Sequence, residues 1–194
     1  AQKLGTAVHI GAVEIRSLHE LDLNDVVIYD KQAEAVLRAD EARVTLRLLS
    51  LLSSPETSIN EILLTGAHVN VVRRADGSWN YDDLGADDTE PRTFAGRIRM
   101  ADASACVDVD GRSYDLSAIT GVVDVERSDV SYDLAGALSG VPLRVRGAYV
   151  GGTQELDLSA SDTDLMQLRH LLPESALPEE LRVESLHVDS LRME

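Results

Sequence analysis

Cysteine, aromatic residues and long apolar runs are scarce in this chain of 194 residues. Cys106 is the one cysteine, so no internal disulfide can form, and its neighbours Ala105 and Val107 predict a small buried side chain within a strand. With one Phe, one Trp and 4% aromatic residues, the chain has few of the rings that stack against sugars. No apolar run reaches the roughly 18 residues of a membrane-spanning helix, so none is predicted.

Residues with catalytic or metal-binding chemistry form no recognisable motif. The histidines make no His-x-His or His-Glu-x-x-His pair, which argues against zinc. The five are His9, His19, His68, His170 and His187. The sequence also lacks a nucleophile elbow, a phosphate-binding loop and a dinucleotide fingerprint. We therefore expect no enzymatic activity, no cofactor and no metal.

Basic residues are outnumbered, with 18 Lys and Arg against 34 Asp and Glu, which gives a formal net charge of -16. This balance disfavours binding to nucleic acid and to anionic membrane surfaces, because both depend on Lys and Arg. The stretch from Asp108 to Gly111 resembles part of a calcium loop, but Cys106 stands where the first acidic ligand is needed. A hairpin turn explains that stretch better. A solvated loop is the interpretation of Asp82, Asp83, Asp87 and Asp88.

Alternating apolar and polar residues between Phe94 and Ala160 are the strongest structural signal in the chain. Because successive side chains of a strand point to opposite faces, one face of a sheet receives the apolar set and the other the polar set. Ser139 to Pro142 and Gly151 to Gln154 have the composition of tight turns. Strands joined by such turns form antiparallel hairpins.

The first half of the chain has the same hairpin pattern. Asp30 to Ala33 separates one pair of strands, and Ala75 to Ser78 separates another, which predicts a strand at Trp79 and Tyr81. We predict an all-β fold, an elongated, curled antiparallel meander of the β-taco or half-pipe kind, with a hydrophobic inner face and one or two short helices. About eleven strands at ~4.8 Å spacing would make a trough on the order of 50 Å long.

The apolar residues of this inner face are aliphatic, which suits a protein core and also suits acyl chains. The residues predicted to line the groove are Val8, Ile10, Ile15, Val26, Ile28, Val44, Leu46, Val69, Val71, Val107, Val109, Leu116, Val123, Val130, Tyr132, Leu134, Val145, Tyr149 and Leu158.

Glycines and tyrosines recur within the predicted strands of the second half. Gly121, Gly136 and Gly147 indicate either curvature of the sheet or space for a ligand along its inner wall. For Tyr114, Tyr132 and Tyr149, aromatic pairing across the sheet or cover over a glycine is favoured over contact with a ligand.

An acidic stretch divides the chain into two parts. We predict a linker loop at residues 85–93, between a β-groove segment at residues 1–84 and a β-meander at residues 94–194. A short helix is expected near residues 162–172. Residues 181–188 echo an earlier strand of the chain, which predicts that the meander continues into a further repeat.

Several motifs occur in a characteristic order between residues 8 and 84. Strand-like segments lead to a bend at Leu51 and Leu52, then to Gly66-Ala67-His68-Val69, and finally to Arg73-Arg74-Ala75-Asp76-Gly77-Ser78-Trp79-Asn80. The order of strand, Leu-Leu bend, Gly-Ala-x-Val strand and Arg-x-x-Asp-Gly-x-Trp-Asn hairpin resembles the N-terminal periplasmic part of the AsmA/TamB family. From residue 94 onward the resemblance is one of pattern.

The resemblance implies a periplasmic location, with an inner-membrane anchor in the full-length protein that this chain does not include. It implies a curled β-sheet whose hydrophobic groove conducts phospholipid between the inner and outer membranes. The partners implied are phospholipid or another acyl-chain ligand, neighbouring β-groove repeats, and an outer-membrane assembly partner contacted through regions absent here. The alternatives are a scaffold or chaperone for outer-membrane protein assembly and a purely structural β-solenoid segment.

Overall fold

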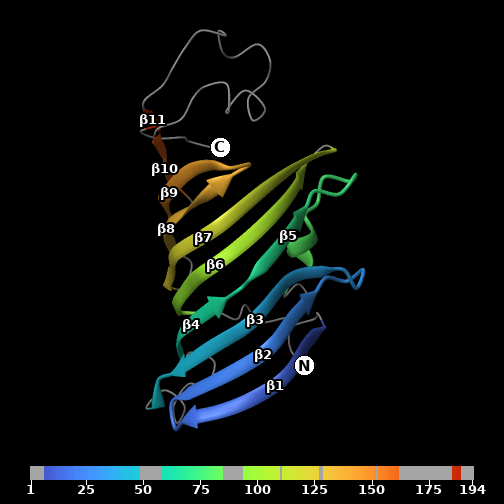
Figure 1. The fold of residues 1–194 in the computed structure, drawn as a ribbon, viewed down its shortest axis with the longest axis vertical. Helices are drawn as coiled ribbons and strands as arrows, with labels where there is room; N and C mark the ends of the chain where they lie inside the picture. The colour runs from blue at the N-terminus through green and yellow to red at the C-terminus, as the bar shows by residue number, and fades with distance from the viewer. Residues whose placement is uncertain are drawn as a thin grey trace, which may run out of the picture.

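The computed structural model describes residues 7–48, 58–84, 94–109, 111–126, 129–151, 153–161 and 185–188 (Figure 1). Within these residues, eleven strands form one sheet. The strands are β1 (Val8–Ser17), β2 (Glu20–Tyr29), β3 (Ala35–Leu46), β4 (Ile59–Thr65), β5 (His68–Val72), β6 (Gly96–Val109), β7 (Arg112–Glu126), β8 (Asp129–Leu138), β9 (Val141–Val150), β10 (Thr153–Ser161) and β11 (Ser185–Val188). One short 3-10 helix, η2 (Asn80–Asp83), follows β5. The predicted all-β fold is confirmed.

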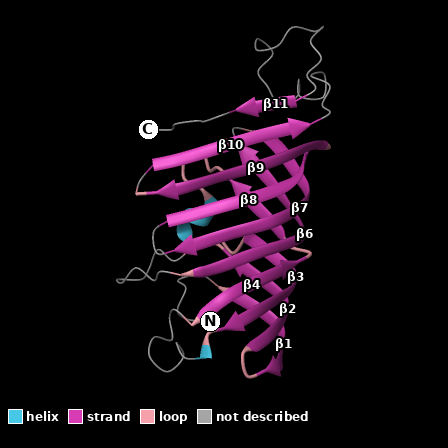
Figure 2. Ribbon diagram, turned by 90° about the vertical axis from the view of Figure 1, so that its left-hand side faces the viewer, coloured by secondary structure: helices cyan, strands magenta, loops and turns pink. Residues whose placement is uncertain are grey.

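The strands follow one another along the sheet almost in chain order, from β1 at one end to β11 at the other (Figures 1 and 2). All hairpin pairs of the described residues are antiparallel, as the meander predicts. One step was not predicted: β4 and β5 both pair with β3 and both run parallel to β6. This pairing joins the two predicted segments in one sheet. The linker expected at residues 85–93 lies outside the described residues.

The apolar alternation shifts by one residue near the middle of the strands from β1 to β7. Apolar residues are then spaced by two, three and two positions, as in Leu21, Leu23, Val26 and Ile28 of β2. At the shift, four residues have a left-handed backbone with φ between 50° and 59°, namely Asp25, Gly66, Asp102 and Ala118. Such a local irregularity reverses which face the following side chains occupy. The apolar residues on both sides of the shift therefore share one face.

The shifts lie side by side in neighbouring strands. A Cβ added to Gly11 in β1 would lie 2.9 Å from the Cβ of Asp25 in β2. Between β4 and β5, Gly66 has no room for a Cβ beside the carboxyl group of Asp40 in β3. The irregularities thus form one continuous line across the sheet, which we call the slip line.

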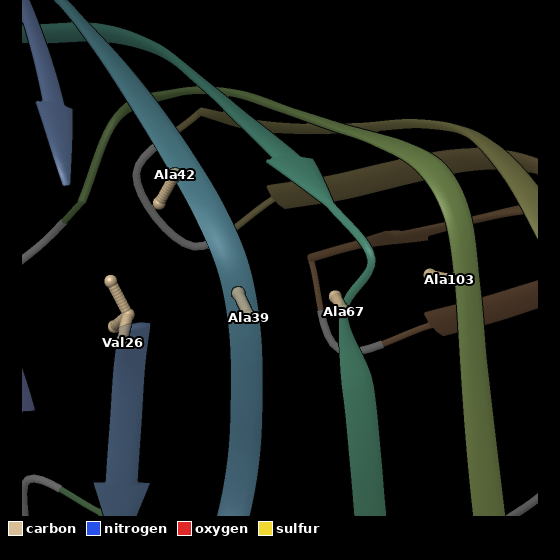
Figure 3. Packing of buried hydrophobic residues seen from close by; sticks show 5 residues of the cluster. All are labelled: Val26, Ala39, Ala42, Ala67 and Ala103. Atoms are coloured by element: carbon tan, nitrogen blue, oxygen red, sulfur yellow. The ribbon is translucent and has the colours of Figure 1, made fainter. Parts of the chain in front are cut away.

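The buried core follows the slip line (Figure 3). Its buried members have exposed fractions of 1 to 7%, and they are Val26, Ala39, Ala42, Ala67 and Ala103. Larger, partly buried side chains of the same face pack against them, namely Leu23, Leu37, Leu64, Met100 and Ile119. The apolar face therefore closes over its smallest side chains, which makes it the inner face of the curled sheet.

The outer face carries ion pairs between neighbouring strands. Asp22 of β2 is buried beneath Arg16 of β1 and Arg43 of β3, with 2.9 Å between its Oδ1 and the Nε of Arg43. Pairs elsewhere on this face join Arg97 to Asp124 and Arg144 to Asp133. The outer face is thus polar and charged, as the alternation predicts.

The segment after β5 differs from the predicted hairpin of two strands. Arg73 and Trp79 form a single isolated antiparallel bridge, and η2 begins at the next residue. The backbone N–H of Trp79 donates to the Oδ2 of Asp82 at 2.7 Å, which favours the helical turn over further pairing. The prediction of a strand at Trp79 and Tyr81 is therefore wrong. Instead, the two rings stack with their centroids 5.7 Å apart.

Two expectations concern the end of the chain. The helix predicted near residues 162–172 lies outside the described residues. The strand predicted from the echo at residues 181–188 is present in part, since β11 pairs with β10 in antiparallel register. No helix within the described ranges is long and apolar enough to cross a bilayer.

Candidate functional site: an apolar trough

The inner face of the sheet is a continuous apolar surface, which we call the trough. Backbone pairing connects its residues into rows that cross the sheet from strand to strand. One row runs through Ile15, Leu21, Val44, Ile62, Ile98, Val123, Tyr132 and Gly147. The next runs through Val13, Leu23, Ala42, Leu64, Met100, Gly121, Leu134 and Val145. On the other side of the slip line, a third row runs through Val8, Ile28, Leu37, Val69, Ala105, Leu116, Leu138 and Val141.

These rows place the predicted lining residues on one face. Ile10 pairs with Val26, Leu46 with Ile59, Val71 with Val107, and Val130 with both Val125 and Tyr149. Val109 lies two positions beyond Val107 in β6, and Leu158 pairs with Val145 through its backbone. The pattern of pairs thus brings the lining residues predicted from both halves of the chain together.

Other trough residues were missed by the sequence prediction. They are Val13, Leu23, Leu37, Ala39, Ala42, Leu64, Ala67, Met100, Ala103 and Ile119. Strict alternation assigns half of each strand to the wrong face when a shift is overlooked. The signal was present in the spacing of two, three and two positions, with Gly or Asp often at the shift.

The trough is unevenly exposed. Val26 in β2 and Val44 in β3 are 7% and 8% exposed, whereas Val13 and Ile15 in the neighbouring strand β1 are 57% and 78% exposed. Tyr149, near the end of β9, is 44% exposed. An apolar ligand would therefore find accessible wall along β1 and at the end of β9, and a filled floor along the slip line.

The strand glycines do not open space for a ligand. A Cβ on Gly147 would lie 2.7 Å from Cζ of Tyr132, so this ring covers the glycine, as favoured from the sequence. At Gly121, the backbone and side chain of Leu134 occupy the space. Gly136 lies against the side chain of Ile119, 3.3 Å from the place of a Cβ. These glycines serve close packing between neighbouring strands.

A polar hollow of about 650 Å³ lies away from the trough, at the ends of β4, β6 and β7. Its lining includes Arg47, Asn60, Glu61, Arg97 and Asp124. Arg97 Nε donates to Asp124 Oδ1 at 2.7 Å, and this contact raises the pKa of the guanidinium. Arg47 Nε donates to the amide oxygen of Asn60 at 3.0 Å. Glu126 and Asp129 also line the hollow, so its carboxylates outnumber its two guanidinium groups.

In the part of the chain that the structure describes, Cys106 and His68 lie on the outer face and do not converge with other reactive side chains. Cys106 is half-buried, with its Sγ 3.1 Å from the Oγ of Ser113, so the prediction that it is a buried apolar side chain is wrong. Cys106 belongs to the polar set of the alternation in β6, so it lies on the outer face together with Asp108. His68 Nδ1 lies 3.0 Å from Ser104 Oγ in an exposed contact. No group of three metal-ligating side chains occurs among the described residues.

Comparison with known proteins gives no assignment. No protein-family model, curated protein or solved structure matches the chain.

Proposed function

We propose that this chain forms part of a hydrophobic groove that holds the acyl chains of phospholipid in a periplasmic protein of the AsmA/TamB kind, and that it conducts them between the inner and outer membranes. The observation that carries the proposal is the trough, an aliphatic face that continues across the sheet from β1 to β9. The resemblance of the motifs between residues 8 and 84 supports the family and the location in this proposal.

The size of the trough supports this function. The path from β1 to β9 has eight positions, so at ~4.8 Å spacing it extends roughly 34 Å. One leaflet of a bilayer contributes about half of a hydrocarbon thickness of ~30 Å. More than one acyl chain can therefore lie along the trough, one after another.

The chemistry of such a conduit is passive. Moving an acyl chain from water to an aliphatic wall is favourable by roughly 0.8 kcal/mol per buried CH₂ group. Because this attraction is non-directional, a chain can slide along the wall without breaking specific contacts. The charged outer face keeps the sheet in water while the inner face holds the lipid. No bond is made or broken.

The direct test is extraction of the purified chain, followed by mass spectrometry of bound phospholipid, in the wild type and in Leu134→Asp. Leu134 lies on the trough between Gly121 and Val145. A carboxylate there costs a few kcal/mol when desolvated by an acyl chain. We expect folded Leu134→Asp to contain no more than about one tenth of the lipid that the wild type binds.

Ala135→Asp is the matched control, because it places the same charge on the exposed outer face of the same strand, opposite Arg144. Its lipid content should equal that of the wild type. Lipid-free wild-type protein, or equal lipid in both variants, would remove the conduit and leave a structural segment. Crosslinking to unfolded outer-membrane strands at the sheet edge, and not in the trough, would favour the scaffold.

A further inference from the structure

Among the described residues, strand β1 is the last strand at one end of the sheet. It pairs with β2 on one side, and no described residue pairs with its other side. Its inner-face residues Ile10, Val13 and Ile15 are 39%, 57% and 78% exposed. Their exposure reflects the absence of a neighbour, since residues of the same rows in β2 and β3 are largely covered.

This edge lacks most of the features by which sheets usually prevent further pairing. Natural edge strands are short or contain proline, lysine, bulges or charges that point inward. β1 has ten residues, contains neither proline nor lysine, and its inner-face residues are all apolar, but it is irregular at Gly11 and between Ile15 and Ser17. It is therefore ready to accept another strand, provided that strand reproduces the spacing of two, three and two positions.

The spacing in β1 is palindromic, and we propose that β1 pairs with β1 of a second copy of this chain. In an antiparallel pair centred between Gly11 and Ala12, Val8 faces Ile15 of the second copy and Ile10 faces Val13. The two slip positions then coincide at the centre, so the slip line continues from one copy into the other. No trough position faces a polar residue in this register.

The outer face of the same register is complementary in chemistry. His9 faces Glu14 of the second copy, and by symmetry Glu14 faces His9, so two imidazole–carboxylate contacts form. Both side chains are exposed in the single chain. Cross-strand pairs of this kind favour one register over its neighbours. A shift of the register by two residues would lose these contacts and place the slip positions opposite apolar residues.

The symmetry of this dimer preserves the trough. A twofold axis perpendicular to the sheet makes the two β1 strands antiparallel and keeps both inner faces on the same side. The dimer therefore has one trough of twice the length, with β11 at each far end. This inference does not depend on what the trough binds.

The first test is the mass of the purified chain by sedimentation equilibrium. We expect a species of twice the chain mass of 21.1 kDa. Val13→Lys places a charge on the inner face of the edge and should weaken association at least about tenfold, because the ammonium would be desolvated in the pair. Leu18→Lys is the control, since Leu18 is 85% exposed and lies beyond the paired residues. It should remain dimeric.

The second test fixes the register by disulfide formation in a Cys106→Ser background. Ala12 and its copy are offset by one residue across the axis, about 6 Å apart between Cα atoms, which is within disulfide range. Ala12→Cys should therefore give a covalent dimer on oxidation. Ala7→Cys is the control, because Ala7 faces Arg16 of the second copy and the two cysteines would be ~31 Å apart.

Three outcomes would overturn the proposal. A monomer at every attainable concentration would do so, as would equal crosslinking of Ala12→Cys and Ala7→Cys. Larger assemblies that grow with concentration would mean that β1 pairs with the far edge of another copy, because such head-to-tail contacts do not close. A dimer that Val13→Lys leaves intact would place the interface elsewhere.

Discussion

At the scale of single residues, Asn80 shows how one side chain can complete the sheet. Its Oδ1 accepts a hydrogen bond from the backbone N–H of Val72 at 3.0 Å, and its Nδ2 donates to the carbonyl oxygen of Asn70 at 2.7 Å. Asn80 is 1% exposed. It occupies the edge of β5 beyond the point where β3 pairs with it. One amide thus takes the place of a partner strand.

Replacing Asn80 with Ala should be costly for this reason. Two partly buried backbone groups of β5 would lose their partners, and we expect the free energy of unfolding to fall by about 2–4 kcal/mol. Urea unfolding followed by circular dichroism measures the change. Asn60→Ala, which removes an exposed amide of β4, should change it by no more than about 0.5 kcal/mol. Equal effects would mean that the bridge to β5 contributes nothing.

The carboxyl group of Asp22 predicts how stability depends on pH. Hydrogen bonds from Arg43 and Arg16 lower its pKa in the folded protein, although burial opposes the shift. Since its pKa is lower folded than unfolded, it stabilises the fold above the unfolded pKa of about 3.9 and loses this effect as pH falls through the folded value. Asp133, beside Arg144, has a lowered pKa for the same reason.

We therefore expect the free energy of unfolding to decline as the pH falls below about 4. Asp22→Asn should be less stable than the wild type at pH 7, and the difference should narrow in acid. Urea midpoints across this pH range measure both effects. For the control Asp115→Asn, at an exposed position of β7, the urea midpoint should change with pH as it does in the wild type. A constant gap between Asp22→Asn and the wild type would contradict the assignment.

At the scale of the strand, the slip line determines which residues form the trough. The sequence predicted the strands and several of their turns, because alternation and turn composition act locally. The turn between β8 and β9, for example, is the two-residue Ser139–Gly140, with φ of 50° and 85°. The sequence did not reveal the shift within each strand. In one strand alone, a spacing of three residues looks like the end of the alternation, and the register with neighbouring strands is needed to recognise it as a shift.

Long-range pairing was equally hard to predict. The parallel step from β4 and β5 to β6 connects parts of the chain 36 residues apart, such as Leu64 and Met100. Turn chemistry identifies hairpins, but it carries no information about which strand a distant segment joins. The role of Asn80 could not be predicted for the same reason. Its hydrogen bonds to the backbone of β5 depend on β5 extending beyond the point where it pairs with β3.

Ala118 in β7 tests the role of the left-handed positions. Its φ of 50° is unfavourable for an L-residue by about 1–2 kcal/mol, a cost that glycine avoids. We expect Ala118→Gly to raise the free energy of unfolding by up to ~1 kcal/mol and Ala118→Val to lower it by more than ~1 kcal/mol. Ala137→Gly in the regular backbone of β8 should destabilise. If Ala118→Gly destabilised equally, the shift would not be strained.

At the scale of the whole molecule, the sheet has one layer and each strand depends on its neighbours in the sheet. The core connects β2, β3 and β6 through Val26, Ala39 and Ala103, whereas β1 contributes exposed residues. Stability in such an array is carried locally and falls toward a free end.

Hydrogen exchange should show this gradient. In the monomeric Val13→Lys protein, we expect amides of β1 to exchange at least about tenfold faster than the paired amides of β3 and β6. Mass spectrometry of peptides after timed labelling measures the difference. Uniform exchange across the sheet would instead indicate a single cooperative unit in which the free edge opens only when the whole chain unfolds.

The line of backbone irregularities also determines how such a molecule can change in size. Because the line crosses the strands from β1 to β7 at one level, a duplicated or deleted pair of these strands would meet its new neighbours in phase. The molecule would become about 10 Å longer or shorter, while the profile seen down its long axis stayed the same. The length of the sheet and the cross-section of its trough are therefore separate properties of this architecture, and the length can be altered without rebuilding the cross-section.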